Sequence, residues 1–175
     1  MNFFSLFTLL ILLGGCITPP SSYIPSEKEK LCNEVTRIAA KEIYNKTGLI
    51  PCGSGGGAMD QIRMLALSFN YPYEVDITEG RKLLIAALET FMSVINEDER
   101  IRTYLINYPF EPKNIEIRIF LQKEDGSNVA LDSLCILGAI DGILSYRIHK
   151  PDGFGLDRVH EETYEEALEK LKSAM

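Results

Sequence analysis

Cysteine and histidine are the residue types in this chain that could carry nucleophilic chemistry, and both are scarce. The 175-residue sequence has 4 cysteines and 2 histidines, His149 and His160. Cys52 stands beside a glycine-rich stretch, so its thiol could act as a nucleophile with either histidine as the base. Such a pair needs hydrogen-bond contact and an electropositive setting that lowers the thiol pKa. No sequence signature supports the pair, so a thiol enzyme or hydrolase is an alternative to the favoured prediction of a non-catalytic domain.

The same residues argue against a bound metal or cofactor. Two histidines are too few for most catalytic zinc sites, and they lack the His-Glu-x-x-His spacing. The glycine cluster at 53–57 contains no Gly-Lys-Ser/Thr, and it follows a predicted helix and precedes a predicted strand. A phosphate-binding loop has the opposite order, because it leads from a strand into a helix N-terminus. We therefore predict no metal site, no cofactor and a flexible surface loop at 53–57.

Another cysteine, Cys16, closes an apolar N-terminal run. Residues 3–13 are almost continuously apolar. That length suits the core of a signal peptide and is too short for a membrane span, which needs about 20 residues. The stretch Leu13, Gly14, Gly15 and Cys16 resembles the lipobox of bacterial lipoproteins.

The resemblance to bacterial lipoproteins implies a processed, lipid-anchored protein. In that family the signal peptide, here residues 1–15, is removed. The cysteine thiol then receives a diacylglyceryl group, and the freed amine is usually acylated with a fatty acid such as palmitate. The resemblance thus implies that Cys16 holds the protein on a membrane of the bacterial cell envelope. Ile17 is not the aspartate linked to inner-membrane retention in some Gram-negative bacteria, so an outer-membrane destination is mildly preferred. Met1 and Asn2 depart from the pattern, because an export signal normally begins with Lys or Arg.

The lipobox divides the chain into three parts. After the signal peptide, residues 16–26 comprise the lipidated cysteine and a tether whose prolines favour an extended, semi-rigid spacer. Residues 27–175 have the length of a single globular domain. The sequence is 46% hydrophobic and 25% charged, which is ordinary for such a domain. Its net charge of −7 argues against nucleic-acid binding. The predicted partners are the membrane, which the lipid on Cys16 would contact, and a protein of the envelope.

An exported domain lies in a compartment where disulfides persist. Three cysteines remain once Cys16 is lipidated, so one intrachain bridge could form. Cys135 falls on the predicted core face of a strand, which favours a buried free thiol. Cys32 and Cys52 are therefore the candidate disulfide pair.

Capping motifs predict the ends of the helices. Ser26 with Glu29 forms a capping box ahead of apolar residues at helical spacing, and Gly48 supplies a stop. Asp76 precedes a helix over about 77–96 that is apolar around most of its circumference. Such a helix is buried by more than one neighbour, so it is predicted to be the centre of the core. A third capping box begins an amphipathic closing helix; its residues are Thr163 and Glu166.

Alternating patterns predict the strands. The apolar run over residues 62–69 predicts one strand. The pattern over residues 115–160 predicts an antiparallel meander. Asp141-Gly142 lies between two apolar runs, which is typical of a tight hairpin. Segregated strands predict an α+β fold, with the meander and one earlier strand packed against the central helix and against N- and C-terminal helices. The predicted function is binding or scaffolding; a small-ligand carrier is a further alternative that would need a sizeable apolar pocket.

Overall fold

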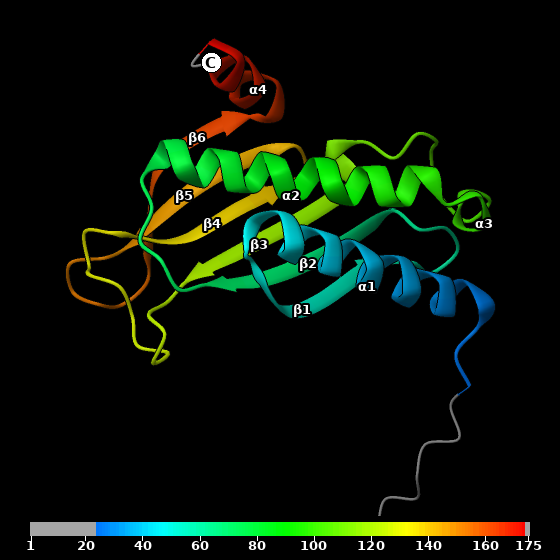
Figure 1. Ribbon diagram of the computed structural model, residues 1–175, viewed down its shortest axis with the longest axis horizontal. Coiled ribbons are helices and arrows are strands. Elements are labelled where there is room, and N and C mark those ends of the chain that lie inside the picture. Colours follow the sequence, from blue (N-terminus) through cyan, green and yellow to red (C-terminus); the bar gives the residue numbers. More distant parts are fainter. Residues whose placement is uncertain (1–23, 174–175) are drawn as a thin grey trace, which may run out of the picture.

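The computed structural model describes residues 24–173 of the chain. The predicted signal peptide, Cys16 and the tether up to residue 23 lie outside the described residues. Four α-helices, one short 3₁₀ helix and a single six-stranded sheet make up the described part (Figure 1). In chain order the elements are α1 (Glu27–Thr47), β1 (Ile50–Gly57), β2 (Met64–Tyr71), α2 (Ile77–Glu97), α3 (Glu99–Arg102), η1 (Pro112–Asn114), β3 (Ile115–Leu121), β4 (Leu134–Ile140), β5 (Ile143–His149), β6 (Leu156–Thr163) and α4 (Tyr164–Ser173).

Helix α1 begins and ends where its local sequence predicts. The Glu29 amide donates to Ser26 Oγ at 3.3 Å, and the Ser26 amide donates to the Glu29 carboxylate at 2.7 Å, which confirms the capping box. Gly48 has a left-handed conformation with φ 77°, and its amide closes the last turn of the helix. Val35 and Ile43 lie on the buried side of α1 and are fully buried.

Helix α2 is the centre of the core, as its sequence predicts. Asp76 Oδ1 accepts a hydrogen bond from the Glu79 amide at 2.7 Å and caps the helix. The helix packs against the sheet, α1 and α4, so it is buried on several sides. Gly80 makes a close approach to the sheet possible, because a Cβ there would lie 3.2 Å from Leu137 Cδ1 and 3.4 Å from Tyr146 Cε1.

Helix α4 closes the described chain and starts at the third capping box. The Thr163 amide donates to the Glu166 carboxylate at 2.9 Å, and the Glu166 amide donates to Thr163 Oγ1 at 3.2 Å. Ala167 is fully buried where α4 meets the rest of the core. No helix within residues 24–173 has both the length and the apolar composition needed to cross a membrane.

The strands lie in the sheet in the same order as in the chain, from β1 to β6. Every neighbouring pair is antiparallel except β2 and β3, which are parallel because α2 connects them as a crossover. The fold class is therefore α+β, as predicted, with a meander over β3–β6. Two strands precede the meander, which is one more than the sequence predicts.

The two faces of the sheet have different surroundings. Leu65 and Leu67 of β2 point toward α1 and α2 and are buried, as are the alternate isoleucines of β3. Helices α1 and α2 cover this face (Figure 1). Ala66 and Ser68 point the other way, toward a face that no helix of the described chain covers. We call this second side of the sheet the open face.

The β4–β5 hairpin turns at Asp141 and Gly142, as the sequence predicts. Both residues have positive φ, 53° and 75°, which the two-residue turn requires. Leu137 lies directly opposite Tyr146, and a register shift between Leu134 and Ile136 interrupts the ladder farther from the turn. This register sends the side chains of Leu137 and Tyr146 to the face that α2 covers.

The prediction of a flexible loop at 53–57 is wrong, because residues Ile50–Gly57 form the strand β1. It pairs antiparallel with β2, and a register shift interrupts the pairing between Pro51 and Gly53. Main-chain hydrogen bonds need no side chain, so the β2 backbone can hold a run of glycines in an extended conformation. Strand β1 is an edge of the sheet, and all eight of its residues are exposed.

Candidate functional site

The fold does not bring together the residues of the predicted thiol–imidazole pair. Cys52 is on β1 at one edge of the sheet, whereas His149 is on β5 and His160 is on β6 at the other edge. Four strand spacings of about 4.8 Å put roughly 19 Å between β1 and β5. Cys52 is exposed as a residue, but partial burial of its thiol raises the pKa, which disfavours the reactive thiolate. In the thiol-enzyme alternative, Cys52 therefore has neither histidine close enough to act as its base.

The three cysteines of the described chain are free thiols. Cys135 is buried, as predicted, and its Sγ lies 3.4 Å from the main-chain oxygen of Arg147, to which it donates. Cys32 is buried beside the Gly56 end of β1, and Cys52 lies exposed at the register shift near the other end. The pairing of Cys32 with Cys52 stays a prediction, as does the lipidation of Cys16.

The histidines do not form a metal site in the described chain. His160 lies opposite Tyr146 in the β5–β6 ladder, whereas His149 lies opposite Leu156 near the turn. Residues 24–173 hold no group of three or more His, Cys, Asp or Glu side chains that could bind a metal ion. The side chain that comes near His160 is Glu162, 3.5 Å from its Nε2.

Glu162 is the buried carboxylate of this fold, with only 3% of the residue exposed. Arg81 Nε and Tyr146 Oη each donate to its Oε1 at 2.7 Å. Lys170 Nζ donates to Oε2 at 2.7 Å, and His160 Nε2 lies on the same side. We call these five residues the Glu162 cluster. The cluster joins α2, β5, β6 and α4, which are far apart in the sequence.

The electrostatics of the Glu162 cluster point to a structural role. Burial alone would raise the pKa of Glu162, but hydrogen bonds from Arg81, Lys170 and Tyr146 outweigh it and lower the pKa to about 2. Burial, together with the hydrogen bond to Glu162, raises the pKa of Tyr146. The Glu162 side chain has 0% exposure, so no substrate can reach the carboxylate.

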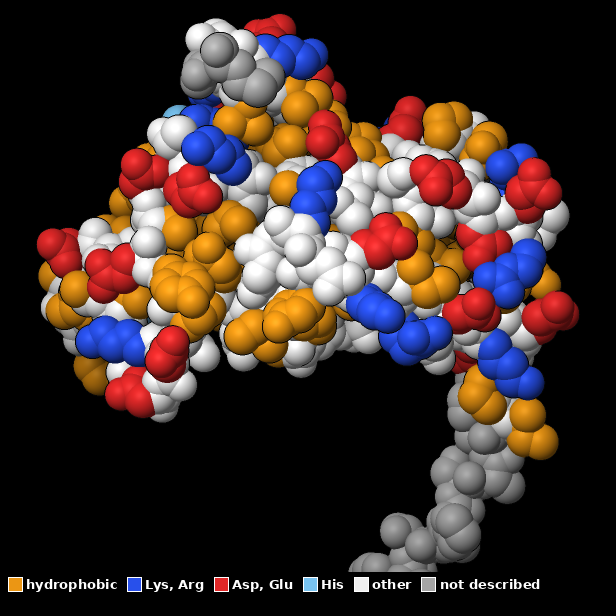
Figure 2. Space-filling view, viewed as in Figure 1, with side chains coloured by type: hydrophobic (Ala, Val, Ile, Leu, Met, Phe, Trp, Pro, Cys, Tyr) orange, Lys and Arg blue, Asp and Glu red, His pale blue; other side chains and the backbone are white. Residues whose placement is uncertain are grey.

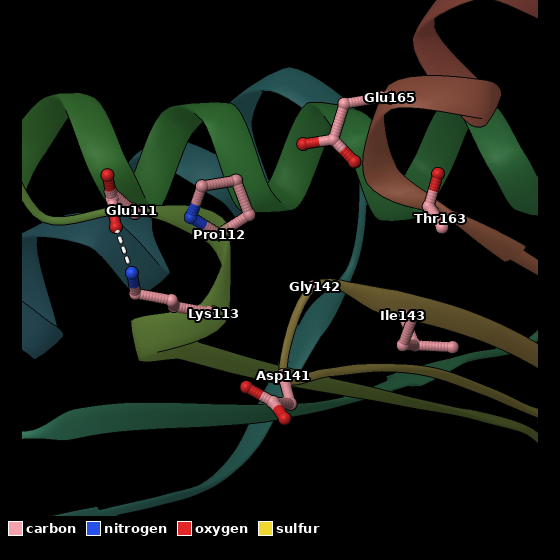
Figure 3. Close-up of a pocket in the computed structure, with 8 residues that line it drawn as sticks. All are labelled: Glu111, Pro112, Lys113, Asp141, Gly142, Ile143, Thr163 and Glu165. Carbon is pink, nitrogen blue, oxygen red and sulfur yellow. Dashed lines mark ion pairs between the residues drawn. The ribbon is translucent and has the colours of Figure 1, made fainter.

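A hollow of about 380 Å³ lies beside the β4–β5 turn (Figure 3). Lys113 Nζ is 2.6 Å from the Glu111 carboxylate, and this ion pair largely neutralises the only cation in the lining. Asp141 and Glu165 lie on other sides of the hollow. The lining includes no cysteine, no histidine and no unpaired cation, so it offers no catalytic set. Its lining residues are Glu111, Pro112, Lys113, Asp141, Gly142, Ile143, Thr163 and Glu165.

A larger hollow, of about 650 Å³, lies where α2 begins, beside the ends of β4–β6. Figure 2 shows hydrophobic side chains gathered at this end of the molecule with acidic side chains around them. The lining is apolar in part, but Glu74, Asp76 and Asp132 also belong to it. Three carboxylates disfavour a neutral ligand of a carrier protein, because such a ligand would remove water from charges that it cannot pair.

Two more hollows, of about 280 and 320 Å³, lie between α1 and β1. Both touch Asn33, Thr36 and Ser54, so they form one continuous feature, which we call the α1–β1 groove. Pro25 of the predicted tether lines one end, and Arg37 lines the other. The groove therefore runs along the free edge of the sheet, directly after the point where the tether ends.

Strand β1 has glycines at positions that do not need glycine for the fold. A Cβ at Gly57 would meet no atom within 4 Å, one at Gly55 would lie 3.9 Å from Ala66 Cβ, and one at Gly53 would lie 3.6 Å from Ser68 Cβ. None of the three has positive φ. Their register with β2 places all three on the open face. We call them the glycine strip.

Gly56 is not part of the glycine strip, because close packing within the chain requires glycine at this position. A Cβ on Gly56 would lie 2.8 Å from the Met64 main-chain oxygen, a distance that real Cβ atoms do not adopt. Within a strand, glycine is less stable than alanine by roughly 0.5–1 kcal/mol per residue. The glycine strip therefore lowers stability without a steric reason inside the described chain. In strands, such glycines mark places where a ligand or another backbone approaches closely.

The two edges of the sheet differ in how they are protected. Edge strand β6 has exposed charges at Asp157, Arg158 and Glu161, which oppose the addition of another strand. Strand β1 has no charged residue, and only Pro51 and the adjacent register shift interrupt it. From Gly53 to Gly57 the edge is thus open to strand addition.

Comparisons of the chain with protein-family models, curated proteins and solved structures find no match.

The glycine strip and the α1–β1 groove together form the candidate functional site. Sequence reasoning missed it by assigning 53–57 to a loop. A signal was present, because glycine recurs at 53, 55 and 57 with the two-residue period of a strand. The arrangement can hold an extended chain through main-chain hydrogen bonds, and it has no group placed for covalent chemistry.

Proposed function

We propose that this protein is a lipid-anchored component of the bacterial envelope whose domain binds an extended segment of a partner protein along β1. The lipobox-like stretch at Leu13–Cys16 and the proline-rich tether support the anchoring. The glycine strip supports the binding, and it is the observation that carries this proposal. The domain has no catalytic role in this function.

Strand addition explains why the strip lacks side chains. An added strand donates and accepts main-chain hydrogen bonds along the free edge of β1, and pockets for alternate side chains provide specificity. Large apolar side chains on a neighbouring strand pack well over strand glycines. The partner segment is therefore extended, with bulky apolar residues at every second position facing the strip. The side chains between them point to the α1–β1 groove, where Asn33 and Thr36 offer polar contacts.

The anchoring is tested by Cys16→Ser. The serine variant cannot form the thioether to diacylglycerol, so we expect it to lose labelling by a fatty-acid analogue and to leave the membrane fraction of the bacterium. Labelling and fractionation are compared with Cys52→Ser, which removes an exposed thiol of the domain and keeps the anchor. Unlabelled wild-type protein, or a Cys16→Ser variant that is labelled and retained like the wild type, contradicts the anchor.

The binding is tested by the double variant Gly55→Val/Gly57→Val. Valine suits an extended strand and has room at both positions, so we expect the free energy of unfolding to rise by about 0.5–1 kcal/mol per site. The same side chains fill the strip. Peptides that wild-type protein selects from a display library of random sequences should therefore bind the double variant at least roughly tenfold more weakly, a loss of about 1.4 kcal/mol.

Two further measurements complete this test. Amide hydrogen exchange of the complex should show new protection at β1 and not at the opposite edge strand. Asp157→Val places valine on that opposite edge and should leave peptide affinity unchanged. Selected peptides that bind wild type and the double variant equally, or protection that appears away from β1, would remove the proposed binding site.

A further inference from the structure

A separate hollow of about 300 Å³ lies on the open face of the sheet, away from β1. It is centred on Gly138 and Ser145, which lie directly opposite each other in the β4–β5 ladder. We call it the Ser145 hollow. Because all its lining residues belong to β3, β4 and β5, it rests on paired strands. The lining consists of Arg118, Phe120, Ile136, Gly138, Ile140, Ser145 and Arg147.

Ser145 supplies a hydroxyl to the lining of the hollow. The residue is only 7% exposed, and its hydroxyl is not among the buried side-chain atoms without a hydrogen-bond partner in residues 24–173, so it lies open to the hollow. A Cβ on Gly138 would lie 3.3 Å from Ser145 Oγ, so glycine at that position leaves the hydroxyl uncovered. A hydroxyl that faces a hollow can donate a hydrogen bond to water or to a ligand there.

Two guanidinium groups line the same hollow. Arg118 forms an ion pair with Glu116 at 2.5 Å. Arg147 forms no ion pair within the described chain, and its ladder neighbour across β5 and β6 is another arginine, Arg158. Glu161, which lies opposite Ser145 in the same ladder, is paired with Arg158, so Arg147 has no counter-charge among the ion pairs of the described residues. In a protein with a net charge of −7, an arginine without an ion pair and a hydroxyl in the same lining favour an anion.

The apolar part of the lining restricts the ligand to an anion that also carries an apolar group. Phe120, Ile136 and Ile140 are apolar, so an ordinary hydrated ion would not match them. Glu116 stands next to Arg118, and its negative charge repels a dianion such as phosphate more strongly than a single carboxylate. The fitting ligand thus has one negative charge and a small apolar body.

We infer that the Ser145 hollow binds small monocarboxylates with an aromatic or short aliphatic body. The carboxylate accepts hydrogen bonds from the Arg147 guanidinium and the Ser145 hydroxyl, and the apolar body lies against Phe120, Ile136 and Ile140. This inference is independent of the strand addition proposed for β1, because the two sites share no residue. It adds a second binding site, for a small molecule, to the open face.

The test is an NMR titration of the full chain, held in uncharged detergent, with sodium phenylacetate as the probe. Saturable shifts of the Gly138 and Ser145 amides are expected, with a dissociation constant in the roughly millimolar range for so small a ligand. Phenylacetamide keeps the apolar body and removes the charge, and acetate keeps the charge and removes the body. Both should bind at least roughly tenfold more weakly, as should inorganic phosphate.

Three variants locate the binding. Arg147→Gln should weaken phenylacetate at least roughly tenfold. Ser145→Ala should weaken it roughly threefold to tenfold. Lys41→Gln removes an exposed cation of α1, on the other side of the sheet, and should leave binding unchanged. The inference is overturned if phenylacetamide or phosphate binds as well as phenylacetate. It is equally overturned if Arg147→Gln keeps full affinity in a protein whose spectrum remains that of the folded wild type.

Discussion

Glu162→Ala should lower the free energy of unfolding by about 3–5 kcal/mol, the usual effect of removing one partner of a buried ion pair. The substitution leaves Arg81 and the Tyr146 hydroxyl without their acceptor in a region that water does not reach. It also disconnects Lys170, and with it α4, from the sheet. Urea denaturation of the wild type and the variant measures the difference.

Glu161→Ala is the matched control for this prediction. Glu161 is the preceding residue on β6, and it forms an exposed ion pair with Arg158. Exposed ion pairs contribute about 0–1 kcal/mol, so the control should stay close to the wild type. Equal losses in Glu161→Ala and Glu162→Ala would mean that the Glu162 cluster does not hold the helices to the sheet.

The second large effect is the acid dependence of stability. The pKa of Glu162 is about 2 in the folded protein and 4.5 in its ordinary range. A lowered pKa means that the contribution of Glu162 is complete above pH 4.5 and is lost as the pH falls toward 2. The difference corresponds to about 3 kcal/mol, because one pKa unit is worth about 1.4 kcal/mol.

The measurement compares the wild type with Glu162→Gln between pH 5 and pH 2. Glutamine has a similar shape and cannot ionise, so subtracting its pH profile removes the titration of the other carboxyl groups. The charged or titratable groups that face Glu162 are Arg81, Tyr146, His160 and Lys170. We expect the stability gap between the two proteins to shrink as the pH falls. A gap that stays constant over this range would place the pKa of Glu162 outside it.

The helix boundaries could be predicted because their determinants are local. Ser26 with Glu29 and Thr163 with Glu166 are three residues apart, and their reciprocal hydrogen bonds form within a single turn. The Asp141-Gly142 turn is equally local, since its two positive φ angles depend on residue type. These features, together with the buried helix and the alternating strands, sufficed for the α+β class.

Strand β1 could not be predicted from propensity. Glycine and proline disfavour strands, and residues 50–57 contain both. The extended conformation comes from pairing with β2, whose own apolar alternation is strong. The order of the strands in the sheet therefore makes β1 an unprotected edge. The binding function proposed for the glycine strip depends on that edge.

The sequence by itself determined the ends of the helices, the β4–β5 turn, the burial of α2 and the expectation of a lipid anchor at Cys16, because each depends on neighbouring residues or on one helix face. Only the tertiary structure decided which distant residues meet. It separated Cys52 from both histidines by placing them toward opposite edges of the sheet. It joined Arg81, Glu162 and Lys170 into one cluster. Such meetings depend on sheet order and on helix packing, and residue spacing along the chain does not encode them.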